Sequence, residues 1–163
     1  MTRLLCCAAA TALSLLPAPA QADDRALADD RALVESFYSQ LLNAPSSPDL
    51  AERAKKLLAS GWVTLGNNSG GGGQEQFVKS VSGFGQVIPN LKWEIQEILR
   101  DGNRYIVRGR ATGTPVKPFF GVDGGGRSFD IMSIDIHTVE NGRITRSFHV
   151  EDWAGAMRQL RQP

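Results

Sequence analysis

Asp152 is the residue whose type and position best suit it to move a proton. It follows a segment, 144–150, in which alternate residues of a strand point to opposite faces, so it shares a face with Phe148 and Val150. A carboxylate beside apolar side chains is desolvated, and desolvation favours its neutral form. Such a group exchanges protons near neutral pH, as a general acid or base must. Asp152 is therefore a candidate catalytic residue.

Each candidate also has a purely structural interpretation. Asp152 directly precedes residues 153–157, so it could be the N-cap of a terminal helix. His137 lies beside Asp135 on what could be a solvated polar strand face, and a one-residue register slip would reverse the face that it takes. His149 has the opposite parity to Phe148. The pattern alone leaves these alternatives open.

Other kinds of active site find little support. The chain has two histidines and two cysteines, and both cysteines, Cys6 and Cys7, lie near the N-terminus. A metal site would need carboxylates to complete it, and neither Gly-x-Ser-x-Gly nor His-Glu-x-x-His occurs. We expect no metal and no serine triad.

The elements that must position these residues follow from the hydrophobic spacing. A period of two from Leu91 onward predicts antiparallel strands, and a period near 3.6 predicts helices before them and at the end. The expected strands are 62–65, a strand carrying Trp93, Ile95 and Ile98, 105–112, 129–139 and 144–150; the expected helices are one buried through Val34, Phe37, Tyr38 and Leu41, then 48–59, 74–87 and 152–160. Helices followed by antiparallel strands predict an α+β fold, with a curved sheet packed by helices on one face.

Two segments resist this assignment. Residues 22–27 and 28–33 repeat the same six letters, and their leucines fall on different helical faces, so we expect a mobile N-terminus. Residues 66–73 hold five glycines without a following Lys-Ser/Thr, so a surface loop is favoured over a phosphate-binding loop.

Composition and the N-terminal residues indicate the number of domains and the localisation of the protein. A length of 163 residues fits one domain, and a net charge of +1 gives no reason to expect nucleic-acid binding. Arg3, the apolar run 4–16 and Ala20-Gln21-Ala22 are typical of a cleaved secretory signal. We therefore expect a signal peptide over 1–22, a single domain over 23–163, no membrane span after cleavage, and a periplasmic or secreted protein.

The C-terminal half resembles the SnoaL-like polyketide cyclases of the nuclear transport factor 2-like superfamily. The segments that carry the resemblance keep their order over about 75 residues: Ile88-Pro89-Asn90-Leu91, Gly113-Thr114, Phe119-Phe120-Gly121, 126–129, 140–144, 148–153 and Gln159-Leu160. The N-terminal helices agree in layout through Phe37-Tyr38 and Trp62. Pro115 stands where the family commonly has histidine. The export signal is a second departure, because polyketide ring closure takes place in the cytoplasm.

The resemblance implies a cone-shaped α+β fold, often dimeric, around an apolar pocket. It implies that an aspartate in the position of Asp152 acts as acid and base in an aldol closure without metal or cofactor, assisted by a histidine matched by His137. The residues expected to line the pocket are Phe148, Val150, Trp93, Phe37 and Tyr38.

These lines of reasoning lead to one hypothesis and two rivals. The hypothesis is an exported protein that binds a small apolar carbonyl compound, with Asp152 catalysing an aldol-type cyclisation, isomerisation or dehydration. The first rival is a non-catalytic module that binds a small ligand in the same pocket. The second is an interaction domain whose sheet face is buried in a homodimer.

Overall fold

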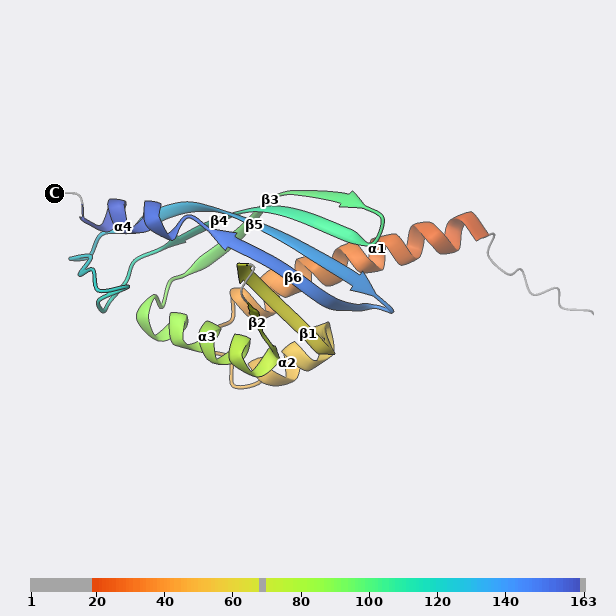
Figure 1. Ribbon diagram of the computed structural model, residues 1–163, viewed down its shortest axis with the longest axis horizontal. Helices are drawn as coiled ribbons and strands as arrows, with labels where there is room; N and C mark the ends of the chain where they lie inside the picture. The colour runs from red at the N-terminus through yellow and green to blue at the C-terminus, as the bar shows by residue number, and fades with distance from the viewer. Residues whose placement is uncertain (1–18, 68–69, 162–163) are drawn as a thin grey trace, which may run out of the picture.

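A six-stranded, curved sheet forms the body of the protein. The computed structural model describes residues 19–67 and 70–161. The strands are β1 (Leu58–Asn67), β2 (Gly70–Gly72), β3 (Lys92–Asp101), β4 (Arg104–Gly113), β5 (Phe129–Glu140) and β6 (Arg143–Glu151). They lie in the order β2-β1-β6-β5-β4-β3, and every neighbouring pair is antiparallel except β1 and β6 (Figure 1).

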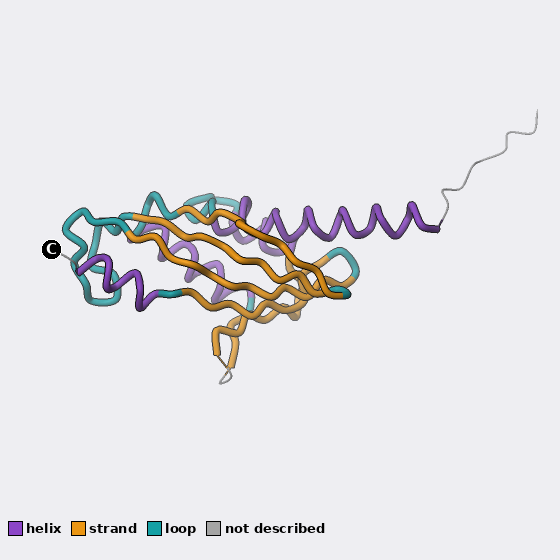
Figure 2. The backbone as a smooth tube through the Cα atoms, turned by 90° about the horizontal axis from the view of Figure 1, so that it is seen from above, coloured by secondary structure: helices purple, strands orange, loops and turns teal. Residues whose placement is uncertain are grey.

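The helices before the last four strands cover one face of this sheet. They are α1 (Pro19–Phe37), a π-helical turn η1 (Tyr38–Leu42), α2 (Leu50–Leu57) and α3 (Gln74–Val87), whereas α4 (Trp153–Arg161) lies at one end of the sheet (Figure 1). The first part of α1 extends beyond the edge of the sheet (Figure 2). This arrangement confirms the expected α+β fold with helices packed on a curved sheet. No helix in the described residues has the length and hydrophobicity to cross a membrane.

The expected elements appear with small shifts in their ends. The helix over 74–87 has the predicted bounds, and the strands 105–112, 129–139 and 144–150 grow by one or two residues. The predicted stripe of Val34, Phe37, Tyr38 and Leu41 is buried. Of the expected signal peptide, residues 1–18 lie outside the described residues, and 19–22 belong to α1.

Two segments have secondary structure that the sequence did not predict. The repeated segment 22–33 is helical, because its alanines, leucines and arginines are good helix formers and need no buried face for that preference. The glycine-rich segment is not a free loop, because Gly70–Gly72 form β2 and pair with β1. Gly70 has a φ of 140°, which residues other than glycine rarely adopt.

The two faces of the sheet differ in an unusual way. In the middle of β5 and the second half of β6, the inner face, which the helices cover, carries polar side chains, and the outer face carries Ile134, Ile136, Phe148 and Val150. A bulge opposite Val139 leaves Thr145 without a partner on β5. As a result His137 pairs with Ser147, Asp135 with His149 and Ser133 with Glu151, and all six side chains share the inner face.

Candidate active site

A pocket lies between the inner face of the sheet and α3. Its volume is about 630 Å³, and its wall is mainly aromatic and aliphatic. Phe37 and Trp93 line it, as expected. The other aromatic and aliphatic lining residues are Leu42, Phe77, Val81, Phe84, Leu91 and Trp153, and Gly70–Gly72 of β2 close one side. The pocket is large enough for a small organic molecule.

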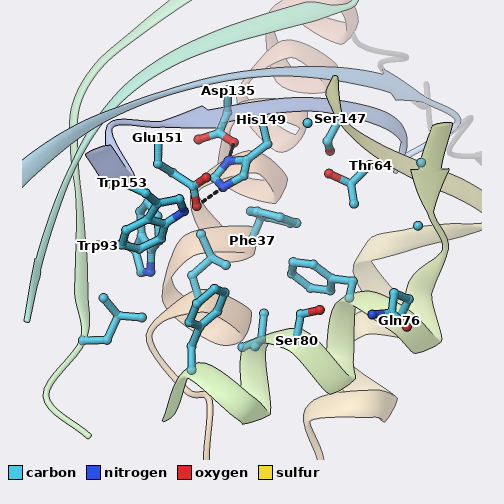
Figure 3. Close-up of a pocket in the computed structure, with 18 of the residues that line it drawn as sticks. Phe37, Thr64, Gln76, Ser80, Trp93, Asp135, Ser147, His149, Glu151 and Trp153 are labelled. Carbon is cyan, nitrogen blue, oxygen red and sulfur yellow. Dashed lines mark hydrogen bonds and ion pairs between the residues drawn. The ribbon is translucent and has the colours of Figure 1, made fainter. Parts of the chain in front are cut away.

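Three charged side chains lie on the sheet side of this pocket, opposite Gln76 and Ser80 of α3 (Figure 3). The imidazole of His149 stands between two carboxylates: Nδ1 is bonded to Oδ1 of Asp135, and Nε2 is bonded to Oε1 of Glu151. The side chains are 1% exposed for Asp135, 12% for Glu151 and 26% for His149. His149 and Glu151 therefore remain within reach of a bound molecule.

The two carboxylates keep His149 charged. Burial disfavours the charged imidazole, but the negative charge of Asp135 and the hydrogen bonds from both carboxylates raise the pKa of His149 from 6.5 to about 10. Burial acts against ionisation of Asp135 as well, yet the neighbouring His149 holds the pKa of that carboxyl below its usual 3.8. At neutral pH the pocket therefore presents an imidazolium flanked by two carboxylates.

His137 lies behind the pocket wall and does not line it. It is fully buried, with Nε2 3.2 Å from the Tyr38 hydroxyl and Nδ1 2.8 Å from Oγ of Ser147. The Tyr38 hydroxyl also donates to Oδ2 of Asp135 at 2.7 Å. Burial lowers the pKa of His137 to about 4, so its ring is neutral at neutral pH. Tyr38, expected in the pocket wall, belongs to this second layer.

We expect stability to be greatest near pH 6.5 and to fall on both sides. Above pH 6.5 the unfolded chain releases the His149 proton that the folded protein retains up to about pH 10, so folding loses free energy as pH rises. Below pH 6.5 the His137 ring is protonated in the unfolded chain, whereas in the folded protein it stays neutral down to about pH 4. Stability therefore falls again as pH is lowered. Each limb is on the order of a few kcal/mol.

Urea unfolding at pH 4.5, 6.5 and 9.5 measures this dependence. The His149→Gln variant is the control, because it lacks the group responsible for the alkaline limb. Equal free energies of unfolding at pH 6.5 and 9.5 in the parent protein would contradict the charged state assigned to His149.

Asp152 lies outside the pocket. Its side chain is 52% exposed, Oδ1 accepts a hydrogen bond from the Gly155 amide at 2.7 Å, and Oδ2 is 3.7 Å from Arg158. The expectation that apolar neighbours desolvate this carboxylate is therefore wrong. The contact with Gly155 fits the helix-cap interpretation, and a Cβ at Gly155 would lie only 2.0 Å from Asp152 Oδ2. A catalytic role for Asp152 stays a prediction.

Phe148 and Val150 lie on the outer face, not in the main pocket. They are 38% and 55% exposed, and with Ile134 and Ile136 they line a shallower depression of about 290 Å³. Asp135, His149 and Glu151, which do line the main pocket, were missed by the sequence reasoning. The signal that could have revealed them is the alternation of Ser133, Asp135 and His137 opposite that of Ser147, His149 and Glu151.

The polar groups of the site are also of the types that bind metal ions. Within residues 19–67 and 70–161, no group of three or more His, Cys, Asp or Glu side chains is arranged to hold a metal ion. Two buried hydroxyls in that part of the chain lack a hydrogen-bond partner, those of Ser133 and Tyr105. Ser133 is the cross-strand neighbour of Glu151, and its Oγ lies over Gly109 of β4, only 2.5 Å from where a Cβ of residue 109 would stand.

Comparison with known proteins points to one family for this chain. The sequence profile described as SnoaL-like polyketide cyclase matches residues 32–160. No curated protein sequence matches the chain.

Solved structures agree on the fold. A candidate SnoaL-like polyketide cyclase from Jannaschia sp. CCS1 is 17% identical with a TM-score of 0.71, over 83% of this chain and 94% of that one. TsrD from Streptomyces laurentii is 22% identical with a TM-score of 0.69, over 82% and 96%. IdmH from Streptomyces antibioticus, a candidate polyketide cyclase, is 23% identical with a TM-score of 0.68, over 80% and 97%.

Proposed function

Because the chain belongs to the SnoaL-like polyketide cyclase family, we propose that it binds a small, largely apolar carbonyl compound and moves a proton on the carbon next to the carbonyl group. The observation that carries this proposal is the His149 imidazolium held between Asp135 and Glu151 in the wall of an otherwise apolar pocket. An enolisation needs a hydrogen-bond donor for the oxygen and a base for the carbon. His149 and Glu151 supply both within one ion pair.

The first step exchanges one partner of His149. The carbonyl oxygen of the substrate takes the place of Glu151 as acceptor from His149 Nε2–H, and the released Glu151 carboxylate removes a proton from the neighbouring carbon. The electron pair of the broken C–H bond forms the enolate, whose oxygen stays hydrogen-bonded to the imidazolium. Asp135, bonded to Nδ1, keeps that imidazolium charged while the enolate exists.

The second step closes a ring when the substrate holds another carbonyl group. The enolate carbon attacks that carbonyl carbon, a C–C bond forms, and the new alkoxide takes the proton back from the Glu151 carboxylic acid. The sequence of steps returns the protein to its starting state and needs no oxidant or reductant.

Deuterium exchange tests this proposal without knowledge of the natural substrate. Aryl ketones such as 1-tetralone and 2-tetralone fit an aromatic pocket of this size, and NMR in D₂O follows the loss of the proton next to the carbonyl group. We expect exchange above the buffer rate that saturates with ketone concentration. Saturable binding without exchange, seen as a change in the fluorescence of Trp93 and Trp153, would instead favour the binding module.

Export and self-association are further parts of the proposal. The leader over 1–22 supports a periplasmic or secreted protein, and N-terminal sequencing of the product from a host with a secretory pathway would test cleavage before Asp23. The exposed apolar side chains of Met132, Phe148 and Val150 on the outer face support a homodimer. A monomeric mass in solution at all practical concentrations would exclude the dimer.

A further inference from the structure

A row of four buried polar side chains connects the body of the protein to the charged cluster of the pocket. Trp62 comes from β1, Ser147 from β6, His137 from β5 and Tyr38 from η1, and each is at most 2% exposed. Each contacts the next through a single hydrogen bond, and the last bond reaches Asp135. The proposed mechanism uses Asp135 and His149 but none of these four.

The donors along this row can be assigned one after another. The Tyr38 hydroxyl has one hydrogen, which it donates to Oδ2 of Asp135, so it must accept from Nε2–H of His137. The ring of His137 is neutral, so Nδ1 carries no hydrogen and must accept from the Ser147 hydroxyl. Ser147 in turn accepts from the Trp62 indole N–H at 3.1 Å.

All donors in this row point the same way, toward Asp135. The order is Trp62 to Ser147, Ser147 to His137, His137 to Tyr38, and Tyr38 to Asp135. The row cannot reverse, because the indole nitrogen of Trp62 is only a donor and the Asp135 carboxylate is only an acceptor. Chains of aligned hydrogen bonds in a buried setting polarise one another, so the last donor in the row is stronger than an isolated hydroxyl.

We propose that Trp62, Ser147, His137 and Tyr38 form a one-way hydrogen-bond chain that fixes the Asp135 carboxylate and so aims the Nε2–H of His149 into the pocket. This inference rests on the proposed function of the Asp135, His149 and Glu151 cluster. It makes His137 a positioning residue, whereas the family resemblance implied a histidine that assists the catalytic aspartate. In this assignment the neutral ring of His137 carries its hydrogen on Nε2, and the charged ring of His149 carries hydrogens on both nitrogens.

Nitrogen NMR of the histidine rings tests the direction of the chain. The protein has only His137 and His149, so histidine labelled with ¹⁵N gives two ring spectra, and the His149→Gln variant assigns them. At pH 7 we expect one neutral ring protonated at Nε2 and one ring protonated at both nitrogens. A His137 ring protonated at Nδ1 would overturn the proposal, because Ser147 would then have no acceptor on it.

A pair of tyrosine variants tests whether the chain positions His149. Tyr38→Phe removes the last donor, and Tyr105→Phe is the matched control, because Tyr105 is equally buried and its hydroxyl has no partner in the described part of the chain. For Tyr38→Phe we expect a moved Nδ1–H resonance of His149 and ketone exchange about tenfold slower at saturation, the size expected for a hydrogen bond to a charged group. Tyr105→Phe should change neither.

The NMR and ketone-exchange measurements test the hydrogen-bond chain and the proposed reaction separately. A Tyr38→Phe variant that is less stable but keeps the parent His149 resonances would overturn the positioning role and leave the reaction standing. A parent protein without ketone exchange but with the expected ring protonation would overturn the proposed function and leave the chain standing.

Discussion

Replacing Glu151 with glutamine is expected to slow the exchange of the ketone proton by about 10²- to 10⁴-fold, the usual contribution of a general base. Glutamine keeps the size of the side chain, and its carbonyl oxygen can still accept from Nε2–H of His149. It cannot take up a proton. The fold and the ketone affinity should therefore stay close to those of the parent protein, and the loss should fall on the rate at saturation.

The neighbouring Asp152→Asn variant gives this experiment its sharpest comparison. Asparagine caps a helix about as well as aspartate, so the bond to the Gly155 amide should survive and stability should change little. We expect exchange at close to the parent rate, as for Glu75→Gln, which alters an exposed carboxylate at the start of α3. The opposite result, exchange lost in the Asp152→Asn variant and kept in the Glu151→Gln variant, would show that the family-derived role of Asp152 is right.

The expected and observed sites differ because the register of β5 and β6 is shifted by one residue. Counting back from the Glu140–Arg143 pair without a bulge aligns His137 with Arg146, and so places it on the face of Phe148 and Asp152. That is the grouping that the family resemblance implied. The bulge at Thr145 moves the partner of His137 to Ser147, and every side chain on β6 beyond it changes its neighbour. A bulge has no reliable signal in a single sequence.

The alternation within each strand was nevertheless predictable, and so was most of the fold. The hydrophobic period gave the antiparallel run and the helix over 74–87, because local spacing determines which residues can share a face. Which face turns inward could not be derived in the same way. The usual rule places the apolar row of a one-sided sheet in the core, and here Ser147 and Asp135 are buried while Phe148 and Val150 are exposed. Asp135 and Ser147 line the pocket on the inner face, where the proposed function requires polar side chains.

Replacing Asp135 with asparagine is expected to lower the free energy of unfolding by about 3–5 kcal/mol, the cost of removing one partner from a buried ion pair. The carboxylate accepts from Tyr38 on one oxygen and from His149 on the other, and both bonds require an acceptor. An asparagine offers one acceptor and one donor, so one of its two neighbours must face an N–H group. Urea unfolding at pH 6.5 measures the loss.

A matched variant and a double mutant distinguish this loss from a general effect of removing charge. Asp130→Asn alters an aspartate on the same strand, 53% exposed and paired with Arg110, and should cost under about 1 kcal/mol. The double variant Asp135→Asn/His149→Gln should be less destabilised than the two single losses summed, because neither member of the Asp135–His149 pair is then left charged without the other. Additive losses would mean that Asp135 and His149 are not coupled, and the ion pair at the centre of the proposed site would then have no energetic basis.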